Sequence, residues 1–241
     1  MIELTGVTKS YGGRMAVKDL NLAIPEGTLF SLVGPNGAGK TTTIKMLCGL
    51  LRPTTGTIRI FGHDLGTDGN AAKALVSYIP DQPHIYEKLT GREFLEMVGR
   101  MYGMDRERLD RRVAETMETL EMGDFADDLV EQYSHGMKQR CVMAAALVHD
   151  PRLIVVDEPM VGLDPRNIRR IKTIFQDFVR KGNVVFMSTH SLSDVEEMSN
   201  SVGIIHNGAM IAMGPVEEVK QKAHAAKFED SFLTLTEGAA S

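Results

Sequence analysis

Short apolar runs alternate along this chain with stretches whose apolar residues recur at helical spacing. The first run, Thr28–Val33, ends at a glycine and is followed by a glycine-rich stretch and a predicted helix over Thr41–Leu51. Five further runs predict β-strands, most of them bounded by Gly, Pro, Asp or Asn: Thr57–Phe61, Leu75–Ile79, Leu153–Val156, Val184–Ser188 and Val202–His206. Alternating strands and helices predict an α/β fold with a mostly parallel sheet covered on both faces.

The middle of the chain has a different pattern. From Thr90 to about Val130 it is rich in Glu, Arg and Met, and apolar residues such as Phe94, Val98 and Met101 recur at helical spacing. This pattern predicts a helical lobe, over approximately residues 90–150, inserted into the α/β core. We assign its charged residues to a solvated surface and give them no chemistry.

The composition is that of one globular domain spanning residues 1–241, with 43% hydrophobic and 24% charged residues. We expect no disorder outside a short C-terminal tail over approximately residues 225–241. The two cysteines, Cys48 and Cys141, lie far apart among apolar residues, which favours buried thiols over a disulfide.

The formal net charge of −5 argues against a surface built for nucleic acid, so we expect no nucleic-acid partner. Nowhere do about 18 apolar residues run together, and the start of the chain has no basic region followed by an apolar stretch. We therefore expect a cytoplasmic protein, unless a partner holds it at a membrane.

The glycine-rich stretch fits G-x-x-x-x-G-K-[ST], the phosphate loop, and lies between a predicted strand and a predicted helix. The matching residues are Gly34, Pro35, Asn36, Gly37, Ala38, Gly39, Lys40 and Thr41, followed by Thr42. Its glycines allow backbone N–H groups to point at phosphate oxygens, and the helix N-terminus adds to the attraction. Lys40 is expected on the β- and γ-phosphates, Thr41 on Mg²⁺ and Thr42 on the α-phosphate. The alternative is an ordinary glycine turn before a helix.

Two carboxylates follow the apolar run Leu153–Val156 directly: Asp157 and Glu158. Open α/β sheets bind ligands at the carboxyl ends of their strands, so both are expected near the phosphates. Asp157 is then a candidate to hold Mg²⁺ through water, and Glu158 is a candidate general base that polarises the attacking water. Without the phosphate loop, two adjacent acids would equally fit an ordinary loop.

Further motifs follow in a fixed order. A polar segment with a glycine, Tyr133–Arg140, opens a predicted helix; then come VVDEP, Gly162–Pro165 and Ser188–His190. Together with the phosphate loop, this set resembles the ATP-binding cassette (ABC) ATPases over nearly the whole chain. The resemblance implies a P-loop NTPase-type, mostly parallel sheet with an antiparallel β edge and an inserted helical lobe. It also implies ATP and Mg²⁺ as cofactors and ATP hydrolysis as the reaction.

The segment Tyr133–Met137 is similar to the family's signature, usually written LSGGQ. In the family this segment binds the γ-phosphate of ATP held by the opposite subunit. Ser134 and Gly136, which the resemblance identifies as the phosphate contacts, are kept. His135 replaces the first glycine and Met137 the glutamine, which leaves the effect of both on the rate open.

Three further residues take roles from the same resemblance. His190 matches the switch histidine that contacts the γ-phosphate and helps to hold the catalytic water. Asp164 matches the aspartate that links the two active sites of a dimer, and Tyr11, which follows a β-like segment, matches the aromatic residue that stacks on adenine. The alternatives are an ordinary histidine, a turn residue before Pro165 and a surface tyrosine on an edge strand.

The segment Tyr78–Pro83 is similar to the Q-loop, whose glutamine senses Mg²⁺ and couples to the membrane partner. The usual pattern places glutamine straight after Tyr-x-Pro, where this chain has Asp81. Gln82 stands one residue later. Either Asp81 replaces the glutamine as an oxygen ligand, or a local adjustment brings Gln82 to the metal.

The resemblance implies two subunits that sandwich two ATP molecules, with a homodimer as the simplest case, and a separate transmembrane permease. The leading interpretation is therefore a transporter's motor subunit, peripheral on the cytoplasmic face of the cell membrane. The segment Phe228–Gly238 is similar to the tails of cassettes that serve export permeases. The alternatives are a soluble cassette ATPase that acts on a ribosome or DNA complex, and an unrelated phosphate-loop kinase or GTPase.

Overall fold

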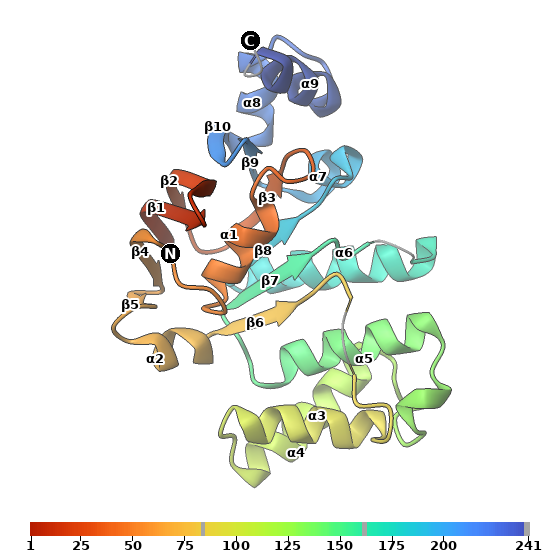
Figure 1. Cartoon of the computed structure of the whole chain (residues 1–241). Coiled ribbons are helices and arrows are strands. Elements are labelled where there is room, and N and C mark those ends of the chain that lie inside the picture. The colour runs from red at the N-terminus through yellow and green to blue at the C-terminus, as the bar shows by residue number, and fades with distance from the viewer. Residues whose placement is uncertain (83–84, 161–162, 239–241) are drawn as a thin grey trace.

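Two β-sheets form the core of the computed structural model, which describes residues 1–82, 85–160 and 163–238 (Figure 1). The larger sheet has the strand order β10-β9-β3-β8-β7-β6, and all its neighbouring pairs are parallel except β9 and β10. Its strands are β3 (Leu29–Val33), β6 (Val76–Ile79), β7 (Leu153–Asp157), β8 (Val184–Ser188), β9 (Ser201–His206) and β10 (Ala209–Pro215). The prediction of a mostly parallel sheet is confirmed.

The central strands are buried on both faces because helices cover each side of the sheet. Every residue of β3, β7 and β8 is buried. Along β7, Leu153 and Val155 pack on the side of the smaller sheet, whereas Ile154 and Val156 pack on the side of the helical lobe. This two-sided burial explains why these strands appear in the sequence as continuous apolar runs rather than as an alternating pattern.

The smaller sheet is antiparallel, with the order β2-β1-β4-β5. Its strands are β1 (Ile2–Tyr11), β2 (Arg14–Ile24), β4 (Thr55–Ile60) and β5 (His63–Asp64). The predicted strand Thr57–Phe61 overlaps β4 and therefore belongs to this antiparallel sheet. In β4 only Ile58 and Ile60 are buried, which is the alternation expected of a strand with one solvated face.

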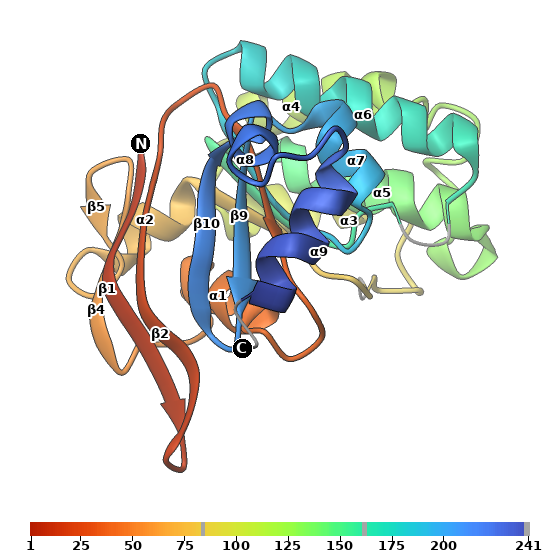
Figure 2. The ribbon, with the colours of Figure 1, turned by 90° about the horizontal axis from the view of Figure 1, so that it is seen from above.

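Helices of the α/β core lie between and beside the sheets: α1 (Lys40–Leu47), α2 (Gly69–Ala74), α6 (Pro165–Arg180), α7 (Leu192–Met198), α8 (Val216–Lys222) and α9 (Phe228–Gly238). The helix predicted to reach Leu51 ends at Leu47, because Gly49 takes the left-handed conformation (φ +65°) that terminates helices. Residues 228–238 of the tail form α9. There α9 packs against α7, α8 and β10 through the buried Phe228 (Figure 2).

The helical lobe lies below β6 in Figure 1 and contains α3 (Gly91–Met101), α4 (Arg106–Thr119), a 3₁₀ turn (Val130–Gln132) and α5 (His135–Val148). Thr90 caps α3 in a reciprocal capping box with Glu93, and Phe94 packs in the lobe's core. Met101, expected on the apolar face, is instead 76% exposed at the last position of α3. None of the helices in the described part of the chain is both long and apolar enough to cross a bilayer.

Both cysteines are buried free thiols, as predicted. Burial raises the pKa of the Cys141 thiol to about 12 and also raises that of Cys48.

Tyr133 ties the start of the signature segment to the rest of the lobe. Its buried hydroxyl accepts a hydrogen bond from the Gly91 backbone nitrogen (3.1 Å) and donates one to the Phe125 carbonyl (2.6 Å). The Tyr133 and Phe125 rings also meet edge to face, with centroids 4.9 Å apart. One side chain therefore satisfies two backbone groups that have little access to water.

Replacing Tyr133 by Phe should lower the free energy of unfolding by about 1–3 kcal/mol, because two buried backbone groups lose their partner. Urea denaturation would measure the loss. The control Tyr86→Phe alters a tyrosine that is 62% exposed and should change the stability little. Equal stability of the two variants would show that the Tyr133 hydroxyl does not hold the lobe together.

Candidate functional site

The phosphate loop connects β3 to α1 and is pressed against neighbouring backbone. A Cβ atom on Gly34 would lie 2.2 Å from the Ile205 carbonyl oxygen, and one on Gly39 would lie 2.6 Å from the Ala16 carbonyl oxygen. Gly39 also takes a φ of +113°, a conformation that side chains disfavour. The glycine spacing of the motif is thus required by close packing as well as by backbone conformation.

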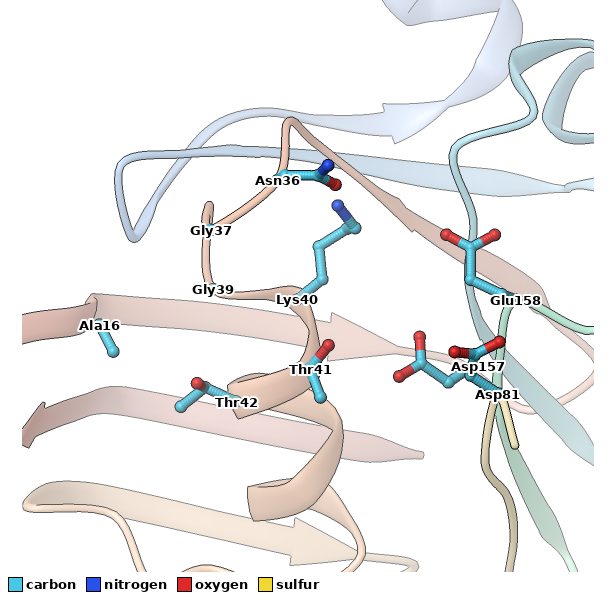
Figure 3. A pocket seen from close by; sticks show the side chains of 10 residues that line it. All are labelled: Ala16, Asn36, Gly37, Gly39, Lys40, Thr41, Thr42, Asp81, Asp157 and Glu158. Atoms are coloured by element: carbon cyan, nitrogen blue, oxygen red, sulfur yellow. The ribbon is translucent and has the colours of Figure 1, made fainter. Parts of the chain in front are cut away.

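Lys40 is the first residue of α1, and its side chain folds back over the loop. Its ammonium donates hydrogen bonds to the carbonyl oxygens of Gly34 (2.5 Å) and Pro35 (3.2 Å). Figure 3 shows the side chain reaching up between Asn36 and Glu158. Burial lowers the pKa of Lys40, whereas the charges of Glu158 and Asp157 act in the opposite direction.

The two predicted carboxylates lie at the carboxyl end of β7. Asp157 is 8% exposed and accepts a hydrogen bond from the Ser188 hydroxyl, at the paired position of β8. The backbone of Glu158 has φ +51°, a left-handed conformation that is uncommon for a side chain of this size. Its nitrogen donates to the Ser188 carbonyl (3.0 Å). The end of β8 therefore holds the Asp157 carboxylate and the Glu158 backbone.

His190, two residues after β8, contacts Glu158 directly. Its Nδ1 lies 2.9 Å from Glu158 Oε2, and its backbone nitrogen donates to the same oxygen (3.3 Å). The imidazole is 69% exposed, whereas the Glu158 side chain is only 18% exposed. The structure thus brings these two candidate catalytic residues together at one oxygen.

A cleft of about 310 Å³ joins the loop to the carboxylates (Figure 3). It is lined by Ala16, Asn36, Gly37, Gly39, Lys40, Thr41, Thr42, Asp81, Asp157 and Glu158. Asp81, just after β6, is therefore at the cleft, and Gln82 is not among the lining residues. Pro83 of the same segment lies outside the described residues.

The side chains on one wall of the cleft are suited to a hard cation. In Figure 3 the carboxylates of Asp81 and Asp157 face the side on which Thr41 presents its hydroxyl, and oxygen donors of this kind suit Mg²⁺. Among the described residues, no three His, Cys, Asp or Glu side chains come close enough to hold a metal unaided. A magnesium ion here would need phosphate oxygens and water to complete its coordination.

A second cavity, of about 560 Å³, adjoins the first and shares Ala16 and Gly37 with it. It is lined by Tyr11, Arg14, Met15, Ala16, Lys18, Gly37, Asn207 and Gly208. Tyr11 is half exposed, and the Lys9 ammonium lies 5.3 Å from its ring centroid. The sequence pattern does not predict Asn207 at this cavity, because only tertiary packing brings the β9–β10 turn there.

The predicted signature residues lie elsewhere. Ser134 caps α5, accepting a hydrogen bond from the Met137 nitrogen (3.3 Å), and is exposed; Gly136 is half-buried in the first turn. Neither residue, nor Asp164, lines either cavity. Within the described part of one chain, the signature segment and the phosphate loop belong to separate surfaces.

Asn167, which no sequence motif predicts as a site residue, lies between Asp164 and the signature segment. The Asn167 amide donates to Asp164 Oδ2 (2.5 Å), and its nitrogen lies 3.0 Å from where a Cβ on Gly136 would be. Backbone hydrogen bonds, led by the one from Asn167, lower the pKa of Asp164, which caps α6. Gly162 of this motif lies outside the described residues.

Comparison with known proteins gives a consistent set of matches. The family model described as ABC transporter matches residues 17–161. The chain is 39% identical over 219 residues to the daunorubicin/doxorubicin resistance ATP-binding protein of Streptomyces peucetius, covering 91% of this chain and 66% of that protein. It is 35% identical to the bacitracin transport ATP-binding protein of Bacillus licheniformis, covering 92% of this chain and 72% of that protein. The chain thus spans about two thirds of the length of these relatives.

Two solved structures are similar over most of the chain. The ATP-binding subunit of an ABC transporter superposes with a TM-score of 0.91 at 29% identity and covers 98% of this chain and 99% of its own. A dimeric ATP-binding cassette in a post-hydrolysis state, bound to ADP and Pi, gives a TM-score of 0.79 at 26% identity, covering 89% of this chain and 98% of its own.

Proposed function

The chain belongs to the ABC transporter family as an ATP-hydrolysing subunit, and we propose that two copies bind two ATP molecules between them to drive a separate membrane permease. The observation that carries this proposal is the separation of the phosphate loop from the signature segment within one chain. Each ATP would be held by the cleft of one copy and by Ser134 and Gly136 of the other.

The surface around Ser134 suits a phosphate group supplied by another chain. The first turn of α5 leaves backbone N–H groups without partners inside the helix, and the helix dipole is positive at that end. Ser134 is exposed, so its hydroxyl is accessible to a second subunit. The similar cassette solved as a dimer bound to ADP and Pi supports this arrangement.

Within one cleft, the loop backbone, Lys40 and Thr42 would bind the phosphates, and Tyr11 would stack on adenine. We assign Mg²⁺ to Thr41 and Asp157, with Asp81 in the position that the family gives to glutamine. Asp81 lines the cleft and Gln82 does not, which favours Asp81. When bound, the ion neutralises charge on the β- and γ-phosphates.

Glu158 is our candidate for the general base that orients water towards the γ-phosphate. Its carboxylate stands across the cleft from Lys40 (Figure 3), and His190 contacts one of its oxygens, which leaves the other free to accept a proton. His190 would therefore fix the orientation of the carboxylate as well as meet the nucleotide.

Replacing Glu158 by Gln keeps the shape of the side chain and removes the base. We expect turnover to fall by about 10²–10⁴-fold while ATP affinity stays within about twofold. Because ATP then remains uncleaved, the variant should form a stable dimer in Mg-ATP, seen as a doubled mass in size-exclusion chromatography with light scattering. The control Glu118→Gln, on the exposed face of α4, should behave as wild type. Unchanged turnover in Glu158→Gln would remove Glu158 from the base role.

The relatives named for drug resistance and for bacitracin transport support an exporting transporter, with this subunit held at the cytoplasmic face of the membrane by its permease. A cleft of about 240 Å³ between β6, α3 and α5 is the surface that we propose for the permease. Its lining includes Phe94, Val98, Tyr102 and His149. Action on a ribosome or DNA complex finds no support in these relatives or in the net charge of −5.

Affinity purification from detergent-solubilised native membranes would test the permease partner. With tagged Glu158→Gln chain and Mg-ATP as bait, we expect a polytopic membrane protein to co-purify in stoichiometric amount. The same bait carrying Val98→Arg should lose that partner and keep its ATP-dependent dimer. Recovery of ribosomal or DNA-bound proteins instead would leave the ATPase chemistry intact and contradict the transporter proposal.

A further inference from the structure

A lysine of α6, the helix that Asp164 caps, pairs with acids of α7, the helix that follows His190. Lys172 lies in the middle of α6, and its ammonium lies 2.8 Å from Asp194 Oδ1 and 2.5 Å from Glu197 Oε2. Both acids belong to α7, which starts at Leu192.

The central part of this contact is shielded from water. The side chains of Lys172 and Asp194 are 12% and 14% exposed. In most other ion pairs among the described residues, at least one partner is largely exposed. Burial alone would lower the pKa of Lys172, but its hydrogen bonds to Asp194 and Glu197 raise it, so the lysine is charged at neutral pH. Removing one partner of such a pair leaves an uncompensated buried charge, which makes the contact costly to break.

α6 also contacts the helical lobe. At its first turn, the Asn167 amide bonds to Asp164 and lies against Gly136 of the signature segment. One turn later, Arg170 forms an ion pair with Glu121 of the lobe. A displacement of the lobe or of Asp164 would therefore act on α6, and Lys172 connects α6 to α7.

We infer that Lys172 is a positioning residue for ATP hydrolysis: it holds α7 on α6 and so keeps the His190 imidazole against the Glu158 carboxylate. Only one residue, Ser191, separates His190 from the first residue of α7, so a shift of α7 moves the histidine directly. The inference rests on the proposed roles of Glu158 and His190. It adds a structural connection, through α6 and α7, between Asp164 and the proposed general base Glu158.

The other side of α7 offers a matched control. There Lys220 of α8 lies 2.7 Å from Glu196, and its side chain is 13% exposed, nearly the same as that of Lys172. This pair also anchors α7, but it links α7 to α8 rather than to α6. Loss of Lys220 removes an ion pair of similar burial from α7 and leaves the link between α7 and α6 in place.

The test is the ATPase rate and the ATP affinity of Lys172→Met, Lys172→Arg and Lys220→Met chains. We expect Lys172→Met to lower kcat about tenfold with ATP Kd within about twofold, because a displaced catalytic group costs rate rather than ground-state binding. Lys172→Arg should recover most of kcat, and Lys220→Met should keep kcat within about twofold of wild type. In a His190→Ala background, Lys172→Met should cause no further loss, since it acts through the histidine.

Equal losses of kcat in Lys172→Met and Lys220→Met would overturn the inference, as would a Lys172→Met loss that adds fully to that of His190→Ala. If Lys172→Met does not fold, the milder Asp194→Asn removes one charge and keeps the side chain's shape. We expect it to lower kcat about threefold, and a folded Asp194→Asn chain with wild-type kcat would contradict the inference. A wild-type rate in His190→Ala alone would instead remove the proposed role of His190, on which the inference depends.

Discussion

The parallel alignment of β3, β8 and β7 is the constraint on which the site depends. Parallel neighbours end at the same edge of a sheet, so the loop after β3, the carboxylates after β7 and His190 after β8 meet there despite their distance in sequence. The hydrogen bond from Ser188 to Asp157, and that from the Glu158 nitrogen to the Ser188 carbonyl, fix the ends of β7 and β8 together. The geometry of the cleft is therefore set by the register of the sheet.

The same fold places the other proposed ATP-site residues away from that edge of the sheet. Ser134 and Gly136 belong to α5 of the lobe, and Asp164 caps α6, whose contacts reach the lobe through Asn167 and α7 through Lys172. A second chain is the simplest source of the missing contacts at each cleft. ATP binding would then draw the two chains together, and a membrane partner can use this motion.

Sequence alone predicts those parts of the structure that depend on the residues of one contiguous segment. The buried runs at Leu153–Val156 and Val184–Ser188 were located because two-sided burial leaves a continuous apolar pattern. The sequence pattern does not predict β2 or β10, because the buried residues of β2 are irregularly spaced and no residue of β10 is fully buried. It predicts Thr57–Phe61 as a strand but not the sheet to which it belongs, because the residues of one strand do not determine its pairing partners. Asn167 and Asn207 were missed for a related reason, since only tertiary packing brings them to their sites. The sequence left Asp81 and Gln82 as alternatives, and the path of the chain after β6 places Asp81 at the cleft.

The most direct test of the central claim, that one chain cannot complete its own ATPase site, is the dependence of the specific ATPase rate on protein concentration at saturating Mg-ATP. If two copies form each site, the rate per chain should rise in proportion to concentration while monomers dominate and level off as dimers saturate. The Ser134→Arg chain, whose own cleft is unaltered, should stay inactive at every concentration. A rate per chain that is constant down to concentrations at which light scattering shows only monomers would contradict the account.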